Sequence, residues 1–140
     1  MLLLPRKGIL AIAAVIDIAL NARGRPVAAK ALASRHRLPP RHLEPVLQAL
    51  VREGILRGVR GPRGGYELAK DQTRISANEI LRAAGTIDAE GEPGPGGSPL
   101  LNHVVLPALE QAEKAFSASL ARISIADLVR AAEGARRAAE

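Results

Sequence analysis

The chain has 140 residues, which suffices for one domain with an appended element, and 47% of them are hydrophobic, so a real core can form. With one Phe and one Tyr, that core must be built from Leu, Ile, Val and Ala, which favours packed helices over an all-β sandwich. The net charge is +6, and the absence of cysteine excludes disulfides, thiolate metal sites and a cysteine nucleophile and fits a reducing compartment.

The first predicted element is a helix over residues 6–22. Its apolar residues recur at helical spacing: Ile9, Ile12, Ala13, Ile16 and Leu20. A secretory signal is the alternative, because Arg6 and Lys7 precede an apolar run. That run is broken by Asp17 and is far shorter than the ~20 residues that span a bilayer. We therefore expect no membrane segment and a cytoplasmic protein.

Two short helices are predicted next, over residues 27–36 and 40–53. Pro26 is expected to start the first, and Leu38-Pro39-Pro40 separates it from the second. The second helix carries its apolar residues on one face: Leu43, Val46, Leu47, Leu50 and Val51. Gly54 ends it. The arrangement predicts two helices joined by a tight turn.

A hairpin follows the helix pair. Residues 55–60 and 66–68 are strand candidates, and the Gly-rich basic turn over residues 61–65 joins them. Ser76 then reads as a helix N-cap, with Glu79 completing a capping box. That pattern predicts a helix through Ala84 that ends near Gly85.

The C-terminal third combines a flexible loop with a long amphipathic helix. Residues 88–99 are rich in Gly and Pro and carry acidic charge alone. Beyond them an apolar stripe recurs at steps of three and four: Val105, Leu109, Ala112, Phe116, Leu120 and Ile123. Pro107 should kink or start this helix, and Ser124 should cap a last short helix before a fraying tail. The stripe either pairs with another chain or packs on its own domain.

The helix pair and the hairpin together predict a winged helix-turn-helix domain, a mostly α fold with a small β-hairpin wing. Charge supports the same interpretation. Residues 1–70 carry 13 Lys/Arg against 4 Asp/Glu, whereas residues 71–140 carry 7 against 10. A basic half is the electrostatic signature of a protein that binds a polyanion, so duplex DNA is the predicted partner.

Candidate DNA contacts lie on the second short helix and on the wing. The N-terminal turn of such a helix meets base edges and phosphates in the major groove. The polar residues on this helix are Arg41, His42, Glu44, Gln48 and Arg52. The wing adds Arg60 and Arg63 between glycines, where arginine suits a narrow minor groove. Each residue alone could be a solvated surface charge. We expect His36 and His42 to be surface or phosphate-contacting residues and not metal ligands.

The sequence resembles the Rrf2 family of bacterial transcription regulators. The resemblance is carried by PVAAKALASRHRLPPRHLEPVLQALVREGIL, RGVRGPRGGYELAK, ISANEILRAAG and ISIADLV, of which the wing segment VRGPRGGYELA is the most specific. It implies a winged-helix domain and a long C-terminal helix that crosses its mate in a homodimer. It also implies base readout by Arg41 and Glu44, and a minor-groove contact by Arg60.

Two departures from the family pattern affect these expectations. Pro45 stands where the family often has a polar base-reading residue, so sequence readout is expected to differ. Many relatives hold an iron–sulfur cluster through cysteines near residues 88–103, and this chain has none. His103 with the nearby carboxylates (Asp88, Glu90 and Glu92) is weak support for a metal site. We therefore expect no metal and no cofactor, and leave a small-molecule or protein effector open.

The sequence thus predicts a DNA-binding domain over residues 1–86, a loop over 87–99, and a dimerisation helix with a short final helix over 100–140. The predicted function is a sequence-specific regulator, a repressor, acting as a homodimer on a palindromic operator. Arg41, Glu44 and Gln48 read bases, Arg60 and Arg63 form the wing contact, and Arg52, Arg57 and His42 hold phosphates. The alternatives are a non-specific DNA-binding accessory protein and a module that docks a metabolic enzyme. No catalytic constellation is recognisable, so an enzyme is not expected.

Overall fold

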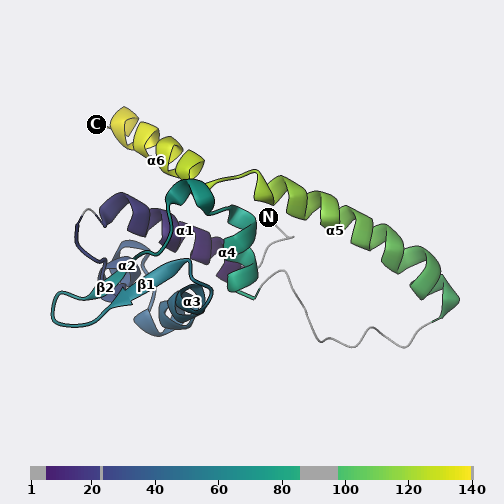
Figure 1. Cartoon of the computed structure of the whole chain (residues 1–140), viewed down its shortest axis with the longest axis horizontal. Coiled ribbons are helices and arrows are strands. Elements are labelled where there is room, and N and C mark those ends of the chain that lie inside the picture. The colour runs from purple at the N-terminus through teal and green to yellow at the C-terminus, as the bar shows by residue number, and fades with distance from the viewer. Residues whose placement is uncertain (1–5, 23, 86–97, 140) are drawn as a thin grey trace.

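The structure is a computed structural model that describes residues 6–22, 24–85 and 98–139. The described elements follow the predicted order, a helical fold with one antiparallel hairpin (Figure 1). They are α1 (Arg6–Asn21), α2 (Ala29–Arg35), α3 (Pro40–Arg52), β1 (Leu56–Val59), β2 (Gly65–Leu68), the 3-10 turn η1 (Gln72–Arg74), α4 (Ala77–Ala83), the π-helical turn η2 (Leu101–Val105), α5 (Leu106–Ala121) and α6 (Ile125–Ala139). The predicted loop over 87–99 lies almost wholly outside the described residues.

The core of the winged domain lies where α1, α3, β1, α4 and the start of α6 meet. Aliphatic side chains fill it, as the scarcity of aromatics requires. Among its fully buried members are Val15, Ile18, Leu32, Leu43, Leu47, Leu50, Ile55, Ile80 and Ile125. Burial of each such side chain contributes about 1.5–3 kcal/mol. This core fixes α3 against the body of the domain with its polar side outward.

The helix-turn-helix begins later than the sequence suggested. Pro26 does not start α2, because Val27 instead pairs with Tyr66 of β2, the two residues exchanging backbone hydrogen bonds of 2.8 Å. The helix therefore begins at Ala29. At its other end Arg37 adopts a left-handed φ of 53°, and the Leu38 amide donates to the Ala33 carbonyl at 2.9 Å. This closure turns the chain sharply into α3.

The wing is a two-stranded antiparallel hairpin with Arg57 opposite Glu67 and Val59 opposite Gly65. Its position depends on Gly65, which lies against the α1–α2 connection. A Cβ at that position would come within 2.4 Å of the Val27 carbonyl oxygen, so the close approach requires glycine. The wing is therefore held against the body of the domain at its base, and its tip projects (Figure 1).

Helix α4 begins as predicted at Ser76, whose hydroxyl accepts the Glu79 amide at 3.1 Å. The structure thus shows the Ser76 half of the predicted capping box. The Glu79 carboxylate accepts a hydrogen bond from Lys70 Nζ at 2.7 Å instead. The same segment anchors the C-terminal part of the chain. The Ala77 amide donates to the Ile123 carbonyl at 2.9 Å, and the Ile125 amide donates to the Ile75 carbonyl at 2.8 Å.

The C-terminal helices are similar in length, 16 and 15 residues, but differ in their surroundings. Helix α5 is a long arm whose C-terminal end lies next to the winged domain and whose N-terminal end lies far from it (Figure 1). Pro107 lies in the first turn of α5, so it marks the start of the helix and does not kink it. The π-helical turn η2 precedes it. Helix α6 packs on α1 and extends for 15 residues, to Ala139. The expectation of a short last helix followed by a fraying tail was therefore wrong over these residues. Ser124 does cap α6, accepting the Asp127 amide at 3.1 Å.

Candidate DNA interface

The outward side of α3 carries the predicted base-reading residues. Arg41, Glu44 and Gln48 are all exposed, and the intervening apolar residues point into the core. Steps of three and four residues place these side chains on one helical face. His42 and Arg52 are exposed on the same helix, near its two ends. The structure thus presents a polar, mainly cationic helix face of the kind that fits a major groove.

Pro45 lies inside α3 without interrupting it. Proline has no N–H, so the Arg41 carbonyl oxygen lacks its usual helical partner. Pro45 is itself exposed, between Glu44 and the buried Val46. Its ring therefore occupies part of the surface on which Arg41 and Glu44 stand. Whether this alters readout stays a prediction.

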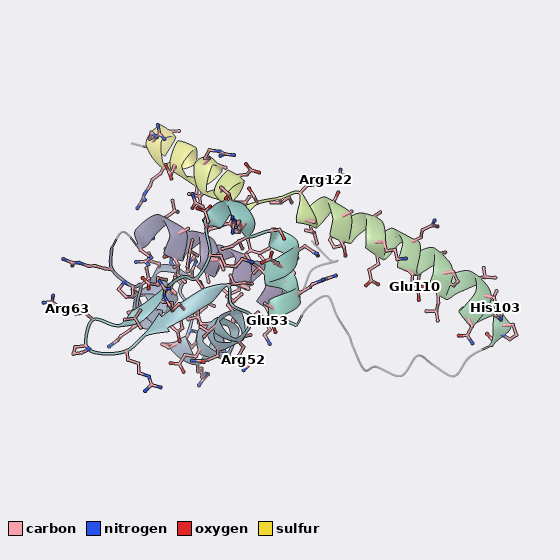
Figure 2. The ribbon with its side chains drawn as sticks, in the orientation of Figure 1. Arg52, Glu53, Arg63, His103, Glu110 and Arg122 are labelled. Atoms are coloured by element: carbon pink, nitrogen blue, oxygen red, sulfur yellow. The ribbon has the colours of Figure 1, made fainter. Side chains whose placement is uncertain are left out.

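The wing brings two further arginines to its tip. Arg60 and Arg63 are exposed, and within the described residues neither guanidinium forms an ion pair. The turn between them is tight, with Gly61 at a φ of 113° and a 2.9 Å hydrogen bond from the Gly64 amide to the Gly61 carbonyl. Arg63 points away from the domain at the tip (Figure 2).

Arg57 is placed differently from the other predicted contacts. Its guanidinium lies 2.8 Å from the carboxylate of Glu67 on the paired strand, in an exposed cross-strand ion pair. The predicted phosphate contact would therefore share the guanidinium with Glu67. An exposed pair of this kind contributes little stability, about 0–1 kcal/mol.

A groove of about 410 Å³ separates α3 from the wing. Gln48 lines it from the helix, and Arg60 and Tyr66 line it from the hairpin. The Gln48 amide donates to the Tyr66 hydroxyl across a long contact of 3.4 Å. Sequence reasoning missed Tyr66, because a lone tyrosine in a strand carries no signal of the helix that it faces. The groove links the predicted base-reading and wing residues in one surface.

A buried carboxylate fixes α1 to the helix pair. Asp17 is 8% exposed, and Arg35 donates to it from two nitrogens at 2.6 and 2.9 Å. His36 Nε2 lies 3.0 Å from the same carboxylate, and Asn21 donates to it at 3.1 Å. Burial raises the pKa of Asp17, but the hydrogen bonds and charge of Arg35 outweigh burial and hold it below its usual range. His36, which was expected to be a surface or phosphate-contacting residue, is half-buried and lies beside Asp17.

The apolar stripe on α5 divides into two parts. Leu120 is buried against Ala77 and Leu81 of α4, with Phe116 half-buried beside it. Toward the other end Leu109 is 61% exposed and Val105 is 37% exposed, and Ala112 is also exposed. Ile123, after the helix, is 38% exposed. The stripe packs on its own domain at one end and is uncovered over the rest of its length.

Family comparison matches residues 4–131 to the family described as "Rrf2: Iron-dependent Transcriptional regulator". The chain belongs to the Rrf2 family. The expected resemblance and the mostly helical fold with a hairpin wing are thereby confirmed. Family members are transcriptional regulators and not enzymes, which agrees with the lack of a recognisable catalytic constellation.

The chain is similar to one relative in sequence and to two solved structures in fold. The HTH-type transcriptional regulator IscR of Escherichia coli is 36% identical over 95 residues, which cover 67% of this chain and 59% of the relative. The structure of T. potens IscR matches with a TM-score of 0.73 at 30% identity, covering 94% of this chain and 88% of that one. The structure of CymR, the global cysteine regulator of B. subtilis, matches at 24% identity with a TM-score of 0.72, over 93% and 98%. The chain thus spans well under two thirds of the E. coli relative's length.

The iron in the family description can be tested against the donor groups of this chain. With no cysteine, thiolate ligation of iron is excluded. In the part of the chain that the structure describes, no three His, Asp or Glu side chains gather closely enough to hold a metal ion. His103 is exposed in the π-helical turn, and the carboxylates at 88, 90 and 92 lie outside the described residues. The described donors do not fit the family's iron centre.

Membrane insertion finds no support in the described helices. None of the helices among residues 6–22, 24–85 and 98–139 has the length and hydropathy needed to cross a bilayer.

Proposed function

We propose that this chain is a sequence-specific DNA-binding transcriptional regulator of the Rrf2 family. The observation that carries the proposal is the surface formed by α3 and the wing. It presents Arg41, Glu44 and Gln48 on one helix face, and Arg60 across a shared groove. A helix in the major groove with an arginine-bearing wing beside it combines base readout with minor-groove recognition.

Each side chain has a separate role in the proposal. Arg41 and Glu44 read base edges, since an arginine suits guanine and a carboxylate accepts from cytosine. Gln48 reads a base from the same helix, and Arg60 enters the minor groove. Arg63 contacts DNA from the wing tip. His42, Arg52 and Arg57 hold phosphates, and Arg57 does so while paired with Glu67.

The regulator acts as a homodimer in this proposal, paired through the uncovered part of α5. Val105, Leu109 and Ala112 form an exposed apolar strip on an arm that leaves the winged domain. Exposed strips of this kind mark contact surfaces, and twofold pairing is the commonest closed arrangement. Two copies of α3 would then meet successive major grooves, about 34 Å or a multiple apart, on a palindromic site.

We further propose that the protein represses transcription in the cytoplasm by occupying its operator. The signal that releases it is a small molecule or a partner protein, because the described residues offer no family-type iron centre. Occupation of a promoter by a bound dimer is sufficient for repression and needs no further catalytic group.

The test is a competition measurement on the full chain. A labelled promoter fragment is titrated with protein and challenged with random-sequence duplex. A sequence-specific regulator holds the fragment against a large excess, because specific binding exceeds non-specific binding by about 10³-fold or more. Arg60→Ala should weaken binding at least about tenfold, since a lost specific contact costs roughly 1–3 kcal/mol.

The matched control is Arg122→Ala, which removes an exposed arginine just after the end of α5 that lies next to the winged domain, on the opposite side of that domain from Arg63 (Figure 2). This control should bind DNA like the parent. Equal competition by random DNA would instead assign the chain to non-specific accessory binding, which Pro45 on the reading face motivates. An Arg60→Ala variant that binds like the parent would contradict the proposed role of the wing.

A further inference from the structure

A second cleft lies on the other side of the wing, between its tip and the α1–α2 connection. Its volume is about 630 Å³, and two arginines line it from opposite walls: Arg25 from the connection and Arg63 from the wing. The remaining lining consists of small or proline residues, so backbone and guanidinium groups dominate its polar surface. No acidic side chain lines the cleft.

The two walls are held in register by the backbone. Val27 and Tyr66 exchange hydrogen bonds of 2.8 Å in both directions, directly beside Arg25 on one wall. Gly65 lies against the Val27 backbone too closely for any Cβ. The connection and the wing base are therefore held together, and Arg25 and Arg63 line the same cleft beside this paired backbone.

Both cations are available to a ligand. Arg25 and Arg63 are exposed, and in the described ranges neither makes an ion pair with a carboxylate. By contrast, Arg35 and Arg57 are each paired with an acid within the domain. Two unpaired guanidiniums around one cleft, with glycine backbone between them, favour an anion with several oxygen acceptors.

We propose that this cleft binds a backbone phosphodiester of the DNA, and that Arg25 is a DNA-contacting residue together with Arg63. The inference rests on the proposed function. A wing that enters a minor groove has a phosphate chain on each side, because both strands border that groove. Arg60 lies on the side of the wing that faces α3, and the Arg25–Arg63 cleft opens on the side away from α3. The cleft would thus engage the strand beyond the wing.

The test measures the salt dependence of DNA binding for the full chain and its variants. The probe is a mixed-sequence duplex of about 40 base pairs, roughly four helical turns, titrated by fluorescence anisotropy between about 50 and 200 mM salt. Loss of one phosphate contact should reduce the slope of log affinity against log salt by about one for each protomer bound. Arg25→Ala and Arg25→Gln should both show this reduction, so the test does not depend on one variant folding.

Two controls sharpen the measurement. Arg25→Lys keeps a cation in the cleft and should retain the parent slope. Arg122→Ala removes an equivalent charge far from the wing and should also retain it (Figure 2). A parent slope in Arg25→Ala, together with a reduced slope in Arg60→Ala, would overturn the role of Arg25 and leave the proposed function standing. A parent without salt-dependent DNA binding would overturn both.

A free anion is the other source of the same chemistry. Inorganic phosphate titrated into the protein without DNA should show no saturable binding that depends on Arg25. Saturable phosphate binding that Arg25→Ala abolishes, with an unchanged DNA slope, would reassign the cleft to a free phosphate ligand and contradict the DNA contact.

Discussion

The winged domain and the α5 arm differ in how far their apolar side chains are buried. In the winged domain the aliphatic residues of α1, α3, α4 and β1 bury one another, and the exposed residues are largely polar or charged. Leu109 of α5 and Val105 of the preceding π-helical turn are exposed, and burial against the domain is confined to the end of α5 near Leu120. The first region has its core within one chain, whereas most of the apolar strip on α5 is not covered by any of the residues that the structure describes.

This difference separates two requirements of a regulator. The DNA-reading surface must be rigid, and it rests on a core that one chain completes. In the proposed dimer, contact between the two chains would set the spacing between the two α3 helices, and the exposed strip on α5 would supply the contact surface. Two backbone hydrogen bonds, from Ala77 to Ile123 and from Ile125 to Ile75, connect the α5–α6 junction to the winged domain. Changes in either region should therefore have separable effects.

The largest effect is expected from a charge on the uncovered strip. Leu109→Glu would place a carboxylate in the proposed dimer contact, so we expect the parent to sediment at twice 14.7 kDa and the variant to sediment as a monomer. Gln111→Glu adds the same charge on another side of α5 and should leave the mass unchanged. A Leu109→Glu protein that keeps the parent mass would show that the strip is not the contact.

A core substitution should produce the next largest effect. Leu47 is fully buried on the inner face of α3, and Leu47→Ala should lower the free energy of unfolding by about 2–5 kcal/mol in urea titration. Leu109→Ala, measured at concentrations where the protein is monomeric, should change it by less than about 0.5 kcal/mol. Similar losses of unfolding free energy in Leu47→Ala and Leu109→Ala would contradict the difference in burial between the core and the α5 arm.

The buried carboxylate should make the winged domain sensitive to acid. The fold lowers the pKa of Asp17, so its contribution is full above the unfolded pKa of about 4 and is lost as the pH falls through the folded pKa. Asp17→Asn should therefore cost about 2 kcal/mol at pH 7, mainly through lost bonds to Arg35. The deficit relative to the parent should shrink at pH 3. A deficit of the same size at both pH values would contradict the pKa assignment.

The smallest effect concerns the turn between α2 and α3. Arg37 has a φ of 53°, which costs an L residue energy that glycine avoids. Arg37→Gly should raise the free energy of unfolding by about 0.5 kcal/mol, because the relief of backbone strain exceeds the cost of the added flexibility of the unfolded chain. Ser34→Gly, inside α2, should lower it by about 0.5–1 kcal/mol in the same urea titration. Destabilisation by both would indicate that Arg37 makes a contribution beyond its backbone.

Local patterns in the sequence predicted most of the elements. The apolar spacing of α1 and α3, the Gly-rich wing turn and the Ser76 cap depend on neighbours in the chain, and the structure bears them out. Helix α2 does not begin at Pro26, because the backbone of Val27 pairs with Tyr66 of β2, 39 residues later in the chain. The length of α6 was missed because its polar tail gives no apolar periodicity.

The exposure of the candidate contacts could be predicted from the sequence, whereas their side-chain partners could not, and their role in DNA binding stays a prediction. Exposed residues such as Arg41 and Arg60 were identified from charge and position. The pairing of Arg57 with Glu67, and the contact between Gln48 and Tyr66, depend on strand register and helix placement. Such relations between distant segments are set by tertiary packing, which a single sequence does not specify.

The most direct measurement is selection of bound sites from a random duplex library by the full chain. The account predicts one enriched motif with two inverted half-sites, separated by about one helical turn or a multiple of it, as paired α3 helices require. Enrichment of no motif would contradict sequence-specific reading by α3 and the wing. Enrichment of a single unrepeated half-site would contradict pairing through the α5 arm.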